Sequence, residues 1–334
     1  MATLLLTIYN YRLTPSNFVS TTTKTQSLLP WHYFHLKQVL HFKNNQISYS
    51  KRRPIKMAGA GEYVSGYPEQ NPGMGDKEIV VIRNKHGEKL VGVLHESGSK
   101  DIVVLCHGFQ SSKESSTIKS LAFALEKEGI SAFRFDFAGN GESEGSFQYG
   151  NYHREADDLR SVIQHFDEAN RVTSTILGHS KGGNVVLLYG SKYHDVNRVI
   201  NVSGRYKTEG GVEERLGKGF LQRVKEDGFI DVKADTGEIL YRVTEESLMD
   251  RLDTNMHEAC LQIDKDCKVL TVHGSNDPVV HVDEALGFAK VIPNHKLHII
   301  EGANHRFSEH REELTSIVLS FIKEPLNDNQ SNKA

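Results

Sequence analysis

The sequence predicts an α/β protein with a mostly parallel, mixed sheet of about eight strands, helices on both faces and a small inserted cap. Three observations predict this fold. Short apolar runs alternate with segments whose apolar residues recur at helical spacing. The first two runs are joined by a turn at His86-Gly87, so the sheet opens with an antiparallel pair. A chain of 334 residues is long enough to cover both faces of such a sheet.

The elements can be assigned in chain order. Glu78–Arg83 and Lys89–Leu94 form the antiparallel opening, and Ile102–Cys106 is continuously apolar, as a buried parallel strand requires. The further strands are expected at Ala132–Phe137, Thr175–Leu177, Arg198–Val202, Val269–Val272 and Leu297–Ile300. The helices are expected at Ile118–Lys127, around Ala156, Leu159, Val162, Ile163 and Phe166, and at Val185–Tyr189, Asp283–Val291 and Glu312–Ile322.

The alternation is interrupted by residues 205–264, which are more charged and lack long apolar runs. A hairpin is expected there, with strands Phe229–Lys233 and Glu238–Val243. A segment of this length is too long for a plain loop, so we interpret it as a cap inserted into a core formed by residues 62–204 and 265–325. The alternative is a flexible excursion without a role. Residues 326–334 are expected to be a disordered tail.

Residues 1–61 contain eight Lys or Arg and no Asp or Glu, are rich in Ser and Thr, and end in the basic cluster Lys51-Arg52-Arg53. This composition is typical of an organelle transit peptide and predicts a chloroplast protein. An ordinary disordered tail is the alternative, and an internal start at Met57 would produce a cytoplasmic form. The remaining chain holds 32 basic and 43 acidic residues, a net charge of about −11, which disfavours nucleic-acid binding.

Other classes of protein are excluded by what the chain lacks. No apolar run approaches the roughly 18 residues of a membrane-spanning helix. Cys106, Cys260 and Cys267 form no Cys-x-x-Cys pair, which argues against a disulfide scaffold or a zinc site and fits a reducing compartment. We expect no cofactor and no metal. The sequence does not indicate an oligomeric state.

Gly178-His179-Ser180-Lys181-Gly182 matches G-x-S-x-G, the pattern of a nucleophilic serine on a sharp turn between a strand and a helix. Ser180 has that context, because it follows one predicted strand and precedes a predicted helix. The second match, around Ser143, lies in a glycine-rich loop. Its neighbours Glu142 and Glu144 would oppose the negative charge of a transition state. Ser180 is therefore the candidate nucleophile, and Ser143 is expected to be a solvated polar residue of its loop.

A serine hydroxyl needs a base to take its proton, and the base needs an orienting carboxylate. Asp277 and His305 each follow a predicted strand, and parallel strands present their carboxyl ends at one edge of a sheet. Ser180, Asp277 and His305 also occur in the order Ser…Asp…His. Asp283 is the alternative carboxylate, but it stands where it would cap a helix. His107, His179 and His273 are expected to hold loops by hydrogen bonds.

The oxyanion of an acyl-transfer reaction needs two fixed N–H donors. The backbone of Lys181, directly after the nucleophile, would supply one donor. The second is assigned to the backbone of Phe109, in the loop after strand Ile102–Cys106. The Lys181 side chain has two possible roles: binding a substrate anion, or remaining solvated or in a salt bridge.

Together these motifs resemble the α/β-hydrolase superfamily, and more closely the capped esterases that include bacterial cinnamoyl (feruloyl) esterases. The resembling stretches are His107–Phe109, Phe133–Phe137 with Gly139–Ser143, Gly178–Gly183, His273–Val280 and Glu301–Phe307. The resemblance implies Ser180 as nucleophile, Asp277 as orienting acid, His305 as base, and Phe109 and Lys181 as oxyanion donors. It also implies a structural role for Asp136–Gly145. Lys181 stands where many relatives have Gln or Met, and the cap does not transfer residue by residue.

The predicted function is a cofactor-free serine hydrolase that cleaves a small-molecule carboxylic ester, with the cap roofing an apolar acyl pocket. A small-molecule receptor, an acyltransferase and a lyase remain alternatives on the same scaffold.

Overall fold

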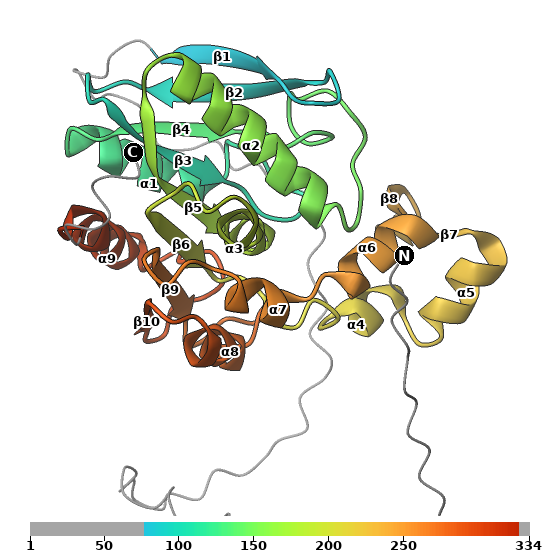
Figure 1. Cartoon of the computed structure of the whole chain (residues 1–334). Helices are drawn as coiled ribbons and strands as arrows, with labels where there is room; N and C mark the ends of the chain where they lie inside the picture. Colours follow the sequence, from blue (N-terminus) through green and yellow to red (C-terminus); the bar gives the residue numbers. More distant parts are fainter. Residues whose placement is uncertain (1–76, 327–334) are drawn as a thin grey trace, which may run out of the picture. The chain divides into compact units, whose positions relative to one another are not determined.

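The computed structural model describes residues 77–326. The predicted leader, residues 1–61, and residues 327–334 of the predicted tail lie outside the described residues, so both assignments stay predictions. The centre of the fold is an eight-stranded sheet of order β1-β2-β4-β3-β5-β6-β9-β10 (Figure 1). Strand β2 (Lys89–His95) pairs antiparallel with β1 (Glu78–Arg83) and β4 (Ser131–Phe135), and the other neighbouring pairs are parallel. The predicted mixed, mostly parallel sheet is confirmed.

The other strands of this sheet are β3 (Asp101–Cys106), β5 (Val172–His179), β6 (Arg198–Val202), β9 (Lys268–Gly274) and β10 (His295–Ile300). Most strands differ from prediction by one to three residues at one or both ends, and two of these differences have a clear cause. β4 ends before Phe137, whose N–H donates to the His107 ring instead of a neighbouring strand. β5 begins at Val172 and not at Thr175, because Val172 and Thr173 pair with β3 on the near side of a β-bulge, which apolar patterning does not reveal.

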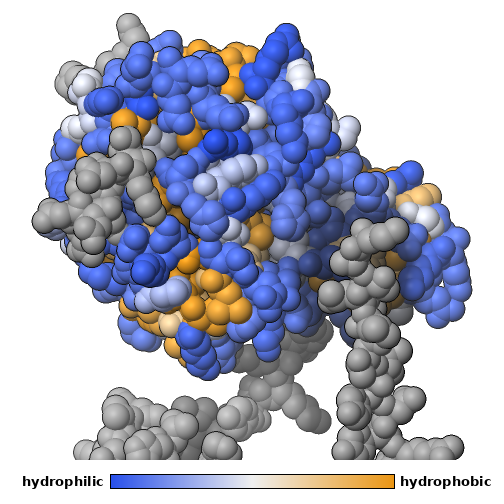
Figure 2. All heavy atoms as spheres, viewed as in Figure 1, coloured by the Kyte–Doolittle hydropathy of each residue, from blue (hydrophilic) through white to orange (hydrophobic). Residues whose placement is uncertain are grey.

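Helices cover both faces of the sheet and bury a separate apolar core on each. α2 (Tyr152–Glu168), α3 (Lys181–Tyr193) and α8 (Asp283–Val291) contribute to one core, and α1 (Ser116–Lys127) and α9 (Arg311–Lys323) to the other. Successive residues of β3 alternate between the two cores, which explains its continuous apolar sequence. The surface in Figure 2 is accordingly mostly hydrophilic, with apolar side chains in a few patches. Within residues 77–326, no helix combines the length and apolarity of a membrane span.

The chain between β6 and β9 leaves the sheet and forms further elements, most of them grouped at one end of the sheet in Figure 1. They are α4 (Val212–Leu216), α5 (Phe220–Asp227), β7 (Phe229–Lys233), β8 (Ile239–Thr244), α6 (Glu245–Asp253) and α7 (Met256–Leu261). The predicted hairpin is confirmed as the antiparallel pair β7–β8. The four helices were not predicted, because each spans too few turns to show a clear apolar period. That this segment acts as a substrate cap stays a prediction.

Candidate active site

Ser180 sits on a sharp turn between β5 and α3, as the G-x-S-x-G pattern predicts. Its backbone has φ 57° and ψ −120°, a conformation that side-chain-bearing residues rarely adopt. The Ser180 N–H donates to the Val202 carbonyl at 2.8 Å, and the Gly183 N–H donates to the Ser180 carbonyl at 2.9 Å. These bonds hold the strained turn and leave the Ser180 side chain facing the carboxyl edge of the sheet.

The glycines of the motif allow the turn to pass close to its neighbours. A Cβ on Gly178 would lie 2.0 Å from the Gly182 carbonyl oxygen, and a Cβ on Gly182 would lie 2.5 Å from that of His107. Backbone atoms cannot give way by such amounts without moving the turn. The two glycines are therefore a steric requirement of this loop.

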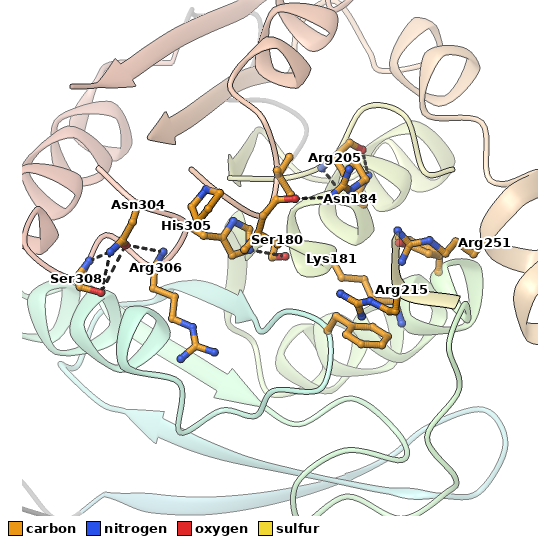
Figure 3. A pocket seen from close by; sticks show the side chains of 15 residues that line it. Ser180, Lys181, Asn184, Arg205, Arg215, Arg251, Asn304, His305, Arg306 and Ser308 are labelled. Carbon is orange, nitrogen blue, oxygen red and sulfur yellow. Dashed lines mark hydrogen bonds between the residues drawn. The ribbon is translucent and has the colours of Figure 1, made fainter. Parts of the chain in front are cut away.

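The structure brings Ser180, Asp277 and His305 together from three loops. The Ser180 hydroxyl lies 3.0 Å from His305 Nε2, and His305 Nδ1 lies 2.7 Å from Asp277 Oδ2 (Figure 3 shows the first contact). Asp277 follows β9 and His305 follows β10, which are adjacent parallel strands. Both residues therefore arrive at the edge where β5 delivers Ser180.

The surroundings of Asp277 fix its charge and its direction. Burial by itself would raise the pKa of this carboxyl, but its contacts with the His273 and His305 rings outweigh burial and hold the pKa below its usual range. Its other oxygen, Oδ1, accepts the N–H groups of Val279 at 2.8 Å and Val280 at 2.9 Å. A charged Asp277 keeps a proton on His305 Nδ1, so the Nε2 lone pair faces the Ser180 hydroxyl.

The three neighbouring histidines hold loops, as predicted. His273 Nε2 donates to the Val280 carbonyl at 2.8 Å, and His179 Nε2 donates to the His305 carbonyl at 2.8 Å. His107 donates from Nδ1 to the Gly108 carbonyl and accepts the Phe137 N–H at Nε2. Burial lowers the pKa of His107 to about 4 and that of His179 to about 3, so both rings are neutral at pH 7.

The predicted oxyanion donors flank Ser180. Lys181 is the first residue of α3, where a backbone N–H has no acceptor within the helix. Phe109 follows Gly108, and a Cβ on Gly108 would lie 3.0 Å from Ser180 Cβ. Within residues 77–326, neither the Phe109 nor the Lys181 N–H has a protein acceptor. Both donors are therefore available beside the serine.

The alternative residues lie in other environments. The Ser143 hydroxyl donates to the Asp136 carbonyl at 2.6 Å and accepts the Val91 N–H at 2.9 Å, so it joins its loop to β2. Asp283 has a largely exposed side chain that lies against His281. Neither takes part in the contacts around Ser180.

The Lys181 side chain points into the core. Its ammonium lies 2.6 Å from Glu155 Oε1 and 5.1 Å from the centre of the Tyr152 ring. Of the two roles left open by the sequence, the structure shows the salt bridge. Burial raises the pKa of Glu155 to about 7, against the opposing effect of the Lys181 charge. Sequence reasoning missed Glu155, although a carboxylate on the buried face of α2, beside Ala156 and Leu159, was a usable signal.

A cavity of about 410 Å³ opens beside Ser180 (Figure 3). The expectation of an apolar acyl pocket was wrong in one respect, because four arginines line this cavity: Arg205, Arg215, Arg251 and Arg306. Phe109, Tyr152, Val279 and Val280 supply apolar walls. The arginines are far apart in the sequence and follow no motif, so only the folded chain reveals that they converge.

The site geometry can be compared with known proteins. The sequence matches the Hydrolase_4 family, described as serine aminopeptidase, S33, over residues 97–260. The structure is similar to that of Est1E from Butyrivibrio proteoclasticus with ferulic acid bound, at a TM-score of 0.63 and 24% identity, covering 73% of this chain and 97% of that chain. The chain therefore has the α/β-hydrolase fold. The predicted resemblance is confirmed.

The structure is also similar to that of the esterase Pf2001 from Pyrococcus furiosus, at a TM-score of 0.58 and 21% identity, covering 75% of this chain and 93% of that chain. It is 28% identical over 229 residues to the uncharacterized Saccharomyces cerevisiae protein YDL057W, covering 62% of this chain and 68% of that protein. The family match includes Ser180 but ends before Asp277 and His305. The placement of that acid and base therefore comes from the three-dimensional structure.

The site contains groups of the kinds that acyl transfer uses. His305 can take the Ser180 proton, and Asp277 can stabilise the resulting imidazolium. The N–H groups of Phe109 and Lys181 are candidates to bind the negative charge that would develop. These groups border a cavity large enough for a small molecule.

Proposed function

We propose that the protein is a serine esterase that hydrolyses a carboxylic ester through an acyl-enzyme on Ser180, without a cofactor. The observation that carries the proposal is the continuous contact from Asp277 through His305 to Ser180 at the wall of the cavity. A hydroxyl in this arrangement is activated at the moment of attack, because the base already accepts its hydrogen bond.

The reaction has two halves. Ser180 Oγ attacks the ester carbonyl carbon while His305 Nε2 takes its proton, and the N–H groups of Phe109 and Lys181 bind the oxyanion. His305 then gives the proton to the departing alkoxide oxygen, and the C–O bond breaks. A water molecule attacks the acyl-enzyme with His305 as base, releasing the carboxylic acid and restoring the Ser180 hydroxyl.

The similarity to a protein named as an esterase, Pf2001, supports ester hydrolysis. The family description suggests a second reaction, removal of N-terminal residues from peptides. The cavity argues against peptides with a free amino terminus. A substrate ammonium group requires negative charge, whereas the described lining includes arginines and no carboxylate.

Turnover of p-nitrophenyl acetate and longer p-nitrophenyl esters tests the proposal. We expect multiple turnovers, with activity lost in Ser180→Ala and kept in Ser143→Ala. A fluorophosphonate probe should label Ser180 and no residue in Ser180→Ala. Slow, single-turnover hydrolysis with ligand-dependent partner binding would instead indicate a receptor. Transfer of the acyl group to an added alcohol faster than to water would indicate an acyltransferase, and C–C bond cleavage without acyl transfer a lyase.

A further inference from the structure

The arginines of the cavity approach Ser180 from more than one direction. Arg215 belongs to α4 and Arg251 to α6, both in the segment between β6 and β9, whereas Arg306 directly follows His305. Figure 3 shows Arg215 and Arg251 on one side of Ser180 and Arg306 on the other. A molecule whose ester carbonyl lay at Ser180 would therefore extend toward one or more guanidinium groups.

The guanidinium groups that the segment between β6 and β9 contributes to the cavity are held in place by contacts with other residues. Arg251 is 7% exposed, and it donates from Nε to the Thr208 carbonyl at 2.9 Å and from Nη2 to the Gly210 carbonyl at 3.1 Å. Arg205 donates to the Val279 carbonyl at 2.6 Å, and the Arg215 guanidinium lies 4.6 Å from the centre of the Phe109 ring. Such anchoring lowers the entropy lost when a ligand binds.

Carbonyl oxygens and rings position these cations but do not neutralise them. Among residues 77–326, no carboxylate forms an ion pair with Arg205, Arg215, Arg251 or Arg306. The other lining cation, Lys181, already has Glu155 as its partner. The cavity therefore holds an excess of positive charge in a body whose net charge is negative.

The charges also repel one another. Burial lowers the pKa of Arg205, and the charge of Arg251 lowers it further, whereas the charge of Glu284 opposes the change. Bringing like charges together in a partly dry cavity costs free energy in the empty protein. An anionic ligand would offset that repulsion and accept hydrogen bonds from the guanidinium groups at the same time.

We propose that the cavity selects esters bearing a carboxylate or phosphate group remote from the scissile bond, bound by Arg215 and Arg251 with Arg205 beside them. The inference rests on the proposed esterase function, because it names the substrate class of that site. Guanidinium groups recognise carboxylate and phosphate by paired, charge-assisted hydrogen bonds. Arg306, at the exposed side of the cavity, would attract the anion during approach.

Three p-nitrophenyl esters with six-carbon acyl chains test the proposal: the monoester of adipic acid, the same ester with its free acid methylated, and the ester of 6-phosphonooxyhexanoic acid. They differ in the remote group, which is a carboxylate, a neutral methyl ester or a phosphate. We expect kcat/KM for one anionic ester to exceed that of the neutral ester by roughly 10- to 100-fold, the range of one or two charged hydrogen bonds. The anionic ester whose kcat/KM exceeds that of the neutral ester by the larger factor identifies the favoured group.

The variants Arg215→Gln and Arg251→Gln should remove most of that preference while the neutral ester is still hydrolysed, which shows that each variant is folded. Arg242→Gln is the matched control, because Arg242 lies in the same segment but is exposed and pairs with Asp231. It should keep the preference. Added salt should raise KM for the anionic esters and leave KM for the neutral ester nearly unchanged.

The outcomes separate the two proposals. Equal hydrolysis of charged and neutral esters by the native protein would overturn the anion selectivity and leave the esterase intact. If no ester is hydrolysed, binding of adipate and of hexyl phosphate is measured by calorimetry with Ser180→Ala. Binding that weakens about tenfold or more in Ser180→Ala/Arg251→Gln would support the anion site and reject the esterase, and no binding would reject both.

Discussion

The ammonium group of Lys181 lies 2.6 Å from Glu155 Oε1, and both side chains are about 95% buried. Lys181 thus has two separate roles. Its side chain is paired in the core, and only its backbone N–H is available to the reaction. The pair also joins the first turn of α3 to that of α2. Disturbing it should therefore affect stability more than chemistry.

Replacing Lys181 with Met removes one partner and leaves Glu155 buried without compensation. We expect a loss of roughly 3–5 kcal/mol in the free energy of unfolding, measured by urea denaturation at pH 8. The double variant Lys181→Met/Glu155→Leu should recover most of that loss, because it removes both polar groups. Equal stability of the single and double variants would contradict the importance of the pair.

Replacing Asp277 with Asn should lower kcat by roughly a thousandfold or more on p-nitrophenyl butyrate. The amide carries no charge to stabilise the imidazolium and can present an N–H to His305, which favours the wrong tautomer. Asp283→Asn is the control, because that side chain is largely exposed. Unchanged kcat in Asp277→Asn, with circular dichroism like that of the native protein, would reject Asp277 as the orienting residue.

Replacing Gly108 with Ala should lower kcat with little change in KM. The new methyl group would lie 3.0 Å from Ser180 Cβ, so the loop that carries the Phe109 N–H must shift. Loss of one oxyanion donor commonly costs about 100- to 1,000-fold in kcat, which sets the upper end of the expected effect. Gly190→Ala meets Val199 at a similar 3.1 Å but lies away from the oxyanion donors, so its kcat should stay near the native value.

Buried neutral histidines predict loss of stability in acid. The pKa values of His179 and His107 are lowered to about 3 and about 4, below the value near 6.5 expected in the unfolded chain. Between these values the unfolded chain binds more protons, so stability is present above pH 6.5 and falls as the pH drops toward 4. Where a histidine is protonated in the unfolded chain and neutral in the folded chain, it lowers the free energy of unfolding by about 1.4 kcal/mol for each pH unit of acidification.

Urea denaturation between pH 4 and pH 8 measures this slope. His179→Gln retains an N–H donor for the His305 carbonyl but cannot be protonated in this range. Its stability should therefore change less with pH than that of the native protein. An identical pH dependence in the two proteins would exclude His179 as a source of acid lability.

The parts of the site that sequence reasoning found are those carried by contiguous motifs at strand ends. Ser180 and its glycines occupy five consecutive positions, and Asp277 and His305 each follow an apolar strand, so topology alone predicts that they meet. The sheet was predictable for the same reason, because continuous apolar strands must be covered on both faces.

The parts that escaped prediction depend on contacts between distant elements. Arg215 and Arg251 lie in short helices without a clear period, and their convergence on Ser180 is visible only after folding. Glu155 could have been recognised as a charge on an apolar helix face, but its partner Lys181 comes from a different helix. Side-chain pairing across elements is not encoded in local spacing.

The inserted segment begins after β6 and ends before β9, and these two strands are adjacent and parallel in the sheet. Its two attachment points therefore stay fixed whatever their connection contains. Natural variation or laboratory recombination can therefore exchange the whole segment between β6 and β9 while β5, β9 and β10 keep their places in the sheet. A protein of this design can change the molecules that it binds while the residues around Ser180 stay the same.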